Sequence, residues 1–180
     1  MNVIETELPG VLIIEPRVFG DERGFFFESF NLQQFQDATG VGADFVQDNH
    51  SRSARNVLRG IHYQLVYPQG KLVRAVVGEV LDVAVDLRRS SPNFGQHVAV
   101  RLSAENKRQL WVPPGFGHGF VVLSEFAEFL YKTTEYWHPE HDRTLAWNDP
   151  SVGVDWGVEE PSLSEKDKHG ATLFEAEVYD

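Results

Sequence analysis

Three short segments carry the side chains best suited to chemistry: RGIHYQ at residues 59–64, QGKLVR at 69–74 and PPGFGHGF at 113–120. The imidazole of His62 titrates near neutral pH and can accept a proton from a carbon acidified by a neighbouring carbonyl. Such a base needs an orienting partner, and a lone histidine in a strand more often has a structural task. Cysteine is absent, so disulfides and thiolate metal sites are excluded.

The spacing P-x-G-x-x-H, which contains Gly115 and His118, is similar to the second sequence motif of the cupins. Metal-binding cupins place two histidines one residue apart in the first motif, with an acidic residue soon after. Here the position of the second histidine after His62 is Gln64, and Lys71 adds a positive charge that repels a metal ion. The pattern predicts no metal site, with a site scattered among the other histidines as the alternative.

The formal net charge of −11 bounds the possible partners. Binding of duplex nucleic acid requires lysine and arginine to neutralise phosphates, so nucleic acid is an unfavourable partner. A small anion is compatible with this charge if a local cationic pocket forms. The acidic start MNVIETELPG does not resemble a secretory signal, and no apolar run reaches membrane-spanning length, which predicts a cytoplasmic protein.

Length and composition predict one globular domain over residues 1–180. Short β-branched or aromatic runs broken by Gly, Pro, Asn and Asp are typical of a β-sandwich or barrel. The clearest run, residues 71–87, predicts two strands joined by a tight turn at Gly78. Asn31 and Ser164 are candidate N-caps of two short helices. Further strands are expected at residues 11–14, 25–30, 97–102, 109–112, 119–123 and 128–137. This spacing predicts a mainly β jelly roll with a few short helices.

An ordered set of motifs carries a resemblance over nearly the whole chain: GDERGFFFESFN, QDNHS, RGIHYQ, QGKLVR, PPGFGHGF, YKTTEYW, WNDP and LSEKD. Each motif alone is weak, but in this order they resemble the dTDP-4-dehydrorhamnose 3,5-epimerase family. The resemblance implies a cupin-type jelly-roll β-sandwich that works without a cofactor. It also implies a homodimer whose subunits exchange N-terminal strands.

The resemblance assigns four catalytic roles. His62 matches the family's base, and Asp167 matches the carboxylate that orients it; the structural alternative is that Asp167 and Ser164 form a capping box. Lys71 would stabilise the negative charge that develops on the ketone oxygen, although a lysine after a turn more often lies at the surface. Tyr131 matches the proton donor on the opposite face, and a phenol near a cation could be a stronger acid; its alternative is a core aromatic.

Ten residues are candidates for substrate binding, most of them from the resemblance. Arginine and lysine suit a diphosphate because they offer charge-assisted hydrogen bonds. Arg23, Arg59 and Lys166 match the family's diphosphate-binding positions. Arg23 would reach into the pocket of the partner subunit. Glu28, Gln47, Asn49 and His118 match nucleotide and sugar contacts. Phe19 and Tyr136 could stack on thymine, although most of the 13 Phe and 5 Tyr must belong to the core. Asp142 stands where the family commonly has a longer glutamate, which leaves that contact in doubt.

The implied activity is epimerisation at C3 and C5 of dTDP-4-dehydro-6-deoxy-glucose, which yields dTDP-4-dehydro-rhamnose. Three alternatives stay open. The first is a mono-epimerase that inverts only C3 or C5, and the second is a dTDP-sugar ketoisomerase on the same scaffold. The third is a non-catalytic sugar-binding cupin, in which the matching polar residues would be incidental.

Arg59 and His62 present a geometric difficulty, because residues three apart in a regular strand point to opposite faces. Gly60 lies between them and tolerates the backbone of a bulge. We therefore expect a β-bulge at Gly60 that turns both side chains into one pocket.

Overall fold

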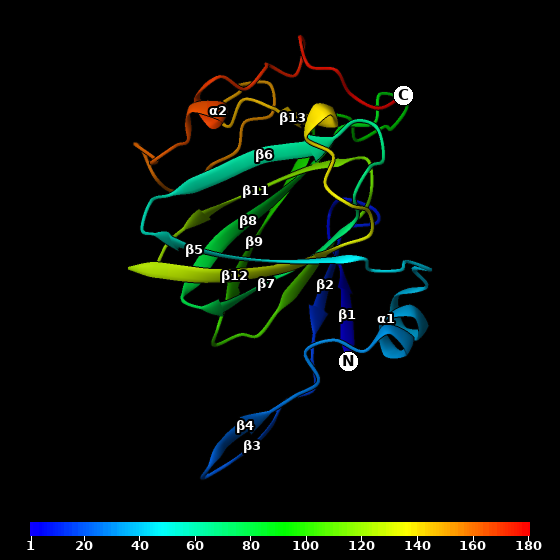
Figure 1. Cartoon of the computed structure of the whole chain (residues 1–180), viewed down its shortest axis with the longest axis vertical. Helices are drawn as coiled ribbons and strands as arrows, with labels where there is room; N and C mark the ends of the chain where they lie inside the picture. Colours follow the sequence, from blue (N-terminus) through cyan, green and yellow to red (C-terminus); the bar gives the residue numbers. More distant parts are fainter.

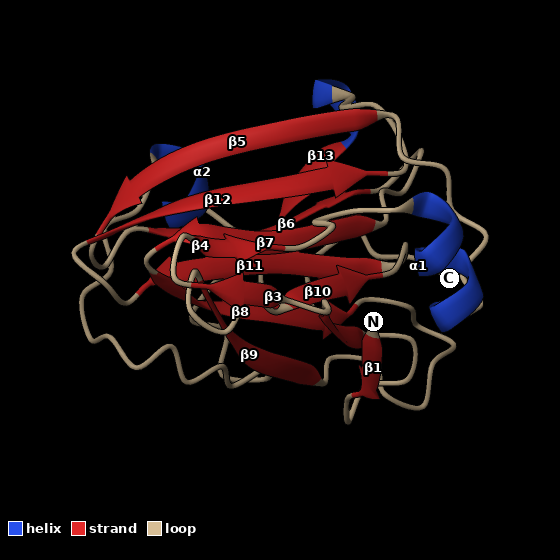
Figure 2. Ribbon diagram, turned by 90° about the horizontal axis from the view of Figure 1, so that it is seen from below, coloured by secondary structure: helices blue, strands red, loops and turns tan.

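Two antiparallel sheets, packed face to face, form the body of the computed structural model, which describes all 180 residues (Figures 1 and 2). The first sheet has the spatial order β1 (Asn2–Glu5), β2 (Leu12–Glu15), β10 (Gln109–Val112), β7 (Lys71–Val77), β12 (Phe126–Thr133) and β5 (Gln47–Ala54). The second has the order β13 (Asp142–Thr144), β6 (Leu58–Gln64), β11 (Phe116–Val122), β8 (Glu79–Asp86) and β9 (His97–Ser103). The prediction of a mainly β jelly-roll sandwich is confirmed.

Smaller elements lie at the margins of the sandwich. β3 (Phe19–Asp21) and β4 (Gly24–Phe26) form a separate hairpin that extends away from the body (Figure 1). The helical elements are α1 (Leu32–Thr39), α2 (Glu165–Lys168) and the 3-10 turn η1 (Pro139–His141). No helix is both long and apolar enough to cross a membrane.

Both faces of the second sheet are covered. Val80 and Ala84 of β8 point between the sheets, where they join the largest apolar cluster. Val83 and Val85 point the other way and pack against the segment after β13, including Trp156. On the outer side of the first sheet, Phe35 of α1 packs in a cluster with Ile14, Leu72 and Trp111. The chain after β13 therefore forms a third layer, and this layer carries α2.

The strands on either side of Gly78 have the predicted positions, but they do not pair with each other. β7 pairs with β10 and β12, whereas β8 pairs with β9 and β11 in the other sheet. Gly78 has a φ of +73°, and it turns the chain from one sheet into the other. The predicted strands and tight turn are confirmed, but a tight turn between two apolar strands has the same local sequence whether they pair or separate into opposed sheets.

Both predicted helix caps are confirmed. The Asn31 side chain accepts a hydrogen bond from the Gln34 backbone N–H at 3.1 Å, and Gly40 ends α1 in the left-handed conformation. The Ser164 hydroxyl accepts a bond from the Asp167 N–H at 3.2 Å at the start of α2. Both short helices therefore begin where the local sequence places them.

Several strand boundaries differ from the expectation. Within residues 25–30 only the start is β, because the chain leaves the hairpin after Phe26 and has no neighbouring strand to pair with. The strand expected at 128–137 is β12, which begins at Phe126 and ends at Thr133. β5 lies at the polar segment QDNHSRSA, for which no strand was expected. Its polar alternation contains few apolar residues, so a search for apolar runs misses it.

The bulge expected at Gly60 is present. β11 and β6 pair His118 with His62 but Phe120 with Arg59. A step of two residues on β11 therefore lies opposite a step of three residues on β6, which is one extra residue on β6. Gly60 has a φ of +122°, and the Gly60–Ile61 peptide bond is cis. A Cβ at Gly60 would lie 2.6 Å from the Gly119 Cα. Close approach of two backbones therefore requires glycine at this position.

Gly60→Ala should destabilise the protein by roughly 2–4 kcal/mol, because a Cβ would meet backbone atoms and an L side chain is strained at this φ. Urea unfolding followed by circular dichroism measures the change. Gly42→Ala is the matched control, since a Cβ there has no atom within 4 Å. Equal stability of the two variants would contradict the proposed need for glycine at residue 60.

Candidate active site

A polar site opens between the two sheets. Two adjoining cavities of about 240 and 350 Å³ share Asn49, His62, Lys71, Tyr131 and Asp142 among their lining residues. The shared residues come from β5, β6, β7, β12 and β13, so both sheets contribute. The structure therefore brings the predicted base, cation and phenol into one site.

Strand alternation explains why these side chains face inward. Along β7, Lys71 has the same parity as Val73 and Ala75, which lie in the inter-sheet core. Along β12, Tyr131 follows Phe129 on the same face, and its backbone lies opposite Asn49 of β5. The site is thus the polar end of the inter-sheet core, where apolar residues give way to lysine, tyrosine and asparagine.

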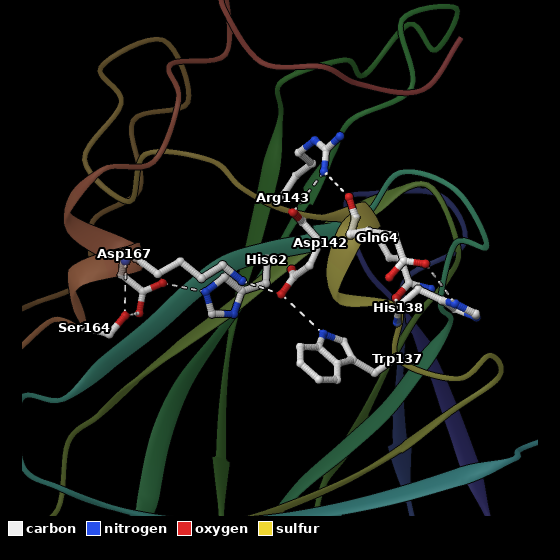
Figure 3. Close-up of polar contacts among 10 residues, drawn as sticks. His62, Gln64, Trp137, His138, Asp142, Arg143, Ser164 and Asp167 are labelled. Carbon is white, nitrogen blue, oxygen red and sulfur yellow. Dashed lines mark hydrogen bonds and ion pairs between the residues drawn. The ribbon is translucent and has the colours of Figure 1, made fainter.

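His62 is held by a carboxylate from the third layer. Its Nε2 lies 2.5 Å from the Asp167 Oδ1, and Asp167 is buried (Figure 3). Donation from Nε2–H to this carboxylate leaves Nδ1 as the nitrogen that can accept a proton. Burial lowers the pKa of His62, against the opposing effect of Asp167. The imidazole is therefore neutral at pH 7, as a general base must be.

Asp167 serves both His62 and the start of α2. Burial opposes ionisation of this carboxyl, but hydrogen bonds from His62 and Ser164 outweigh it and lower the pKa of Asp167. The Ser164 hydroxyl donates to Oδ2 at 2.8 Å, while Oδ1 faces His62. The capping interaction and the orientation of the base therefore coexist, with Asp167 ionised.

Lys71 is buried beside a second histidine–carboxylate pair. His118 Nε2 lies 2.9 Å from Asp82 Oδ1, and both residues are buried. Burial lowers the pKa of Lys71 to about 8, against the opposing charges of Asp142 and Asp82. Lys71 therefore remains mostly charged at neutral pH, which stabilising an oxyanion requires.

Tyr131 remains protonated in this site. Burial raises the pKa of Tyr131, and the positive charge of Arg59 only partly offsets that effect. The expected acid-strengthening by a nearby cation is present but is outweighed by desolvation. Tyr131 can therefore donate a proton, without being a stronger acid than an ordinary phenol.

Polar and cationic residues surround the catalytic candidates. The Arg59 Nε donates to the Ser53 Oγ at 3.0 Å, and the Lys166 ammonium donates to the Asp142 carboxylate at 2.5 Å. Both cations line the larger cavity. The Gln47 side chain lines the smaller cavity and donates to the Asn49 side chain at 3.0 Å. The cationic pocket expected inside this acidic protein is therefore present.

Four predicted binding residues lie outside these cavities. Phe19 and Arg23 belong to the projecting β3–β4 hairpin, where Arg23 is paired with Asp21 and both are exposed. Glu28 accepts hydrogen bonds at the start of α1, from the Gln34 side chain at 2.7 Å and from Asn31. Tyr136 is exposed, although the Gln64 side chain binds its backbone carbonyl. One chain alone does not assemble these four with the pocket.

Sequence reasoning missed three residues of the site. Gln64 is buried, and its amide bonds the backbone of Tyr67, Tyr136 and His138, so it ties together two segments at the mouth of the site. Trp137 lines the smaller cavity. Asp82 is hydrogen-bonded to His118. The sequence could have indicated Asp82 as a site residue, because it is a single carboxylate on the inward face of the apolar segment EVLDVAV. No group of three or more His, Asp or Glu side chains has an arrangement that could hold a metal ion.

Comparison with known proteins decides the family. The profile of the family described as dTDP-4-dehydrorhamnose 3,5-epimerase matches residues 5–175. The chain belongs to the dTDP-4-dehydrorhamnose 3,5-epimerase family. It is 62% identical over 180 residues to the Pseudomonas aeruginosa dTDP-4-dehydrorhamnose 3,5-epimerase, covering 99% of both chains.

Solved structures agree with this membership. An epimerase from Legionella pneumophila, crystallised with dTDP-4-keto-L-rhamnose, has a TM-score of 0.94 at 52% identity, over 96% of this chain and 93% of that chain. A 3'-monoepimerase from Streptomyces bikiniensis, crystallised with dTDP-quinovose, has a TM-score of 0.88 at 32% identity, over 94% and 87%. The scaffold is therefore shared by epimerases that differ in how many carbons they invert.

Asp167→Asn should reduce turnover by about a hundredfold or more, because the imidazolium formed during proton transfer loses its negative partner. Asp167 raises the pKa of His62, so its loss should also move the acidic limb of kcat/KM to lower pH. A pH–rate profile of the epimerisation measures both effects. Glu165→Gln, an exposed change on the same helix, is the control; an unchanged Asp167→Asn profile would contradict the pairing.

Proposed function

We propose that this protein inverts C3 and C5 of dTDP-4-dehydro-6-deoxy-glucose to give dTDP-4-dehydro-rhamnose. The observation that carries the proposal is the position of His62 and Tyr131 on opposed sheets around one site. A sugar ring between them is accessible to a base on one face and a proton donor on the other. This arrangement suits inversion of a carbon next to a ketone.

Each inversion needs only proton transfers. His62 Nδ1 takes the proton from C3 or C5, and the C–H electron pair forms the enolate with its charge on the C4 oxygen. Lys71 stabilises this oxyanion, which in a site shielded from water contributes on the order of a thousandfold in rate. Tyr131 then donates its hydroxyl proton to the opposite face of the carbon, and the C4 carbonyl re-forms. Solvent exchange afterwards restores His62 and Tyr131.

The remaining assigned residues bind the nucleotide and the sugar. Arg59 and Lys166 pair with the diphosphate. Gln47, Asn49 and His118, which line the cavities, contact the ligand by hydrogen bonds. Glu28 and the stacking residues Phe19 and Tyr136 complete the nucleotide site together with Arg23. The ligand is a dTDP-linked 4-keto-6-deoxy sugar, and a cytoplasmic location stays a prediction.

The functional unit is a homodimer that exchanges N-terminal segments. The β3–β4 hairpin exposes 63% of Phe25 and 67% of Phe26, an aromatic surface that a monomer would leave in water. The hairpin also carries Arg23, which is absent from the lining of both active-site cavities of its own chain. Insertion of this hairpin into a second copy buries the aromatic rings and delivers Arg23 to the partner's diphosphate.

A mono-epimerase is the second candidate, and the close structural likeness to a 3'-monoepimerase favours keeping it. Base, oxyanion site and donor are the same in both cases. The outcome then depends on whether the keto sugar, after its first inversion, can present its second carbon to His62 before it leaves the site. The number of carbons that exchange with solvent separates the two activities.

Incubation of the protein with the keto-sugar nucleotide in deuterated water, followed by NMR, tests the proposed function. We expect deuterium at both C3 and C5. His62→Ala should abolish exchange at both carbons, and Tyr131→Phe should retain some exchange while misdirecting the product. Label at one carbon indicates a mono-epimerase or a ketoisomerase, which product identification distinguishes, and no label indicates a binding protein.

Mixing two inactive variants tests the exchanged hairpin. In a random mixture of Arg23→Ala and His62→Ala subunits, half of the dimers are mixed, and each mixed dimer has one intact site if Arg23 acts in the partner. Activity should therefore recover to about a quarter of the wild-type level. Unfolding and refolding the two variants together allows exchange, and each variant refolded alone is the control. Failure to recover activity would show that Arg23 acts within its own subunit, whereas full activity of Arg23→Ala refolded alone would show that it has no role.

A further inference from the structure

Asp142 places a carboxylate in a site that binds a diphosphate, although a carboxylate repels that ligand. It lines both cavities. β13 pairs with β6 so that Asp142 lies opposite Gln64 and Thr144 lies opposite His62, which places the aspartate beside the catalytic strand. The pairing of β13 with β6 therefore places a negative charge in the site. The contacts of the Asp142 carboxylate indicate what this charge does.

Two side chains from distant segments meet at the Asp142 carboxylate. Oδ2 accepts a hydrogen bond from the Lys166 ammonium of α2 at 2.5 Å. The same oxygen accepts one from the Trp137 indole N–H at 3.4 Å (Figure 3). Lys166 adjoins Asp167, the partner of the base, and Trp137 forms part of the wall of the smaller cavity. Asp142 thus connects β13, α2 and the segment after β12.

Two of the three carboxylates near the site are already bonded to histidines, which leaves Asp142 to balance the lysines. Asp167 is bonded to His62, and Asp82 is bonded to His118. The cations Arg59, Lys71 and Lys166 share the larger cavity, whose lining contains no acidic residue other than Asp142. Asp142 is therefore the carboxylate available to balance Lys71 and Lys166 together.

We propose that Asp142 is a positioning residue that holds Lys166 and Trp137 in place and acts as the counter-charge that keeps Lys71 protonated for stabilisation of the oxyanion. This role rests on the proposed epimerase function, and it differs from the direct substrate contact that the resemblance implies for this position. The carboxylate oxygen engaged by Lys166 and Trp137 is less available to a sugar hydroxyl.

The electrostatics of the neighbouring groups agree with this role. Burial lowers the pKa of Lys71, and among the opposing charges Asp142 contributes more than Asp82. The ionisable side chains that share a cavity with Lys71 are His50 on β5, Arg59, His62 and Tyr63 on β6, His118 on β11, Tyr131 on β12, Asp142 on β13 and Lys166 on α2. The buried Asp82 on β8 also acts on Lys71. Asp142 also raises the pKa of Tyr131. Removal of its charge should make both Lys71 and Tyr131 lose their protons at lower pH.

The pH dependence of kcat/KM in Asp142→Asn and Asp142→Glu tests the proposal. The asparagine keeps the shape without the charge, so the alkaline limb should move to lower pH and the ratio of activity at pH 9 to that at pH 7 should fall about threefold or more. The glutamate keeps the charge and should retain the wild-type ratio. Asp44→Asn, an exposed aspartate with no side-chain partner, is the control for charge removal. A parallel NMR titration of the Lys71 side chain should show the same shift without depending on activity.

Two results would overturn the proposal: a profile of Asp142→Asn that superimposes on the wild type, or an equal shift in Asp142→Glu. An unshifted Lys71 titration in Asp142→Asn would do the same. Failure of the proposed function itself is distinguishable, because the wild-type protein would then show no epimerisation from which to measure a profile.

Discussion

The hydrogen bond between His62 and Asp167 joins residues 105 positions apart, and the other features of the site depend on it. It fixes which imidazole nitrogen carries the proton and leaves the other nitrogen free to accept one. The bond forms only if the segment after β13 packs on the outer face of the second sheet, where Val152 and Trp156 are buried. Packing of this third layer therefore shapes the site, because it places α2 against β6.

Asp167 illustrates how one residue can satisfy a structural and a chemical requirement. Its backbone N–H is capped by Ser164, one carboxylate oxygen accepts from the same hydroxyl, and the other faces His62. The helix start restricts the carboxylate to one orientation. A rigid carboxylate holds the imidazole more effectively than a mobile one, since little side-chain freedom remains to be lost.

The charge distribution resolves the contrast between a protein of net charge −11 and an anionic substrate. The positive side chains that matter are gathered at one end of the inter-sheet core, where Lys71 is buried and Arg59 and Lys166 line the cavity. Buried charges are costly unless they are paired, so the same region contains Asp82 and Asp142. The acidic surface elsewhere affects solubility without determining what the pocket binds.

The sequence by itself determined the fold class, both helix caps and the bulge at Gly60, and it singled out His62, Lys71 and Tyr131, which the fold brings into one site. These depend on local residue chemistry or on an ordered set of motifs, both of which are visible along the chain. It did not determine that β7 and β8 part into different sheets, that the polar segment of β5 is a strand, or that Asp82 and Gln64 support the site. It also gave no indication that the Asp142 carboxylate meets Lys166 and Trp137. Those features were decided by tertiary structure, because each depends on contacts between segments that are distant in sequence. Local interactions leave several conformations of each segment nearly equal in free energy, and the free energy of packing the two sheets selects among them.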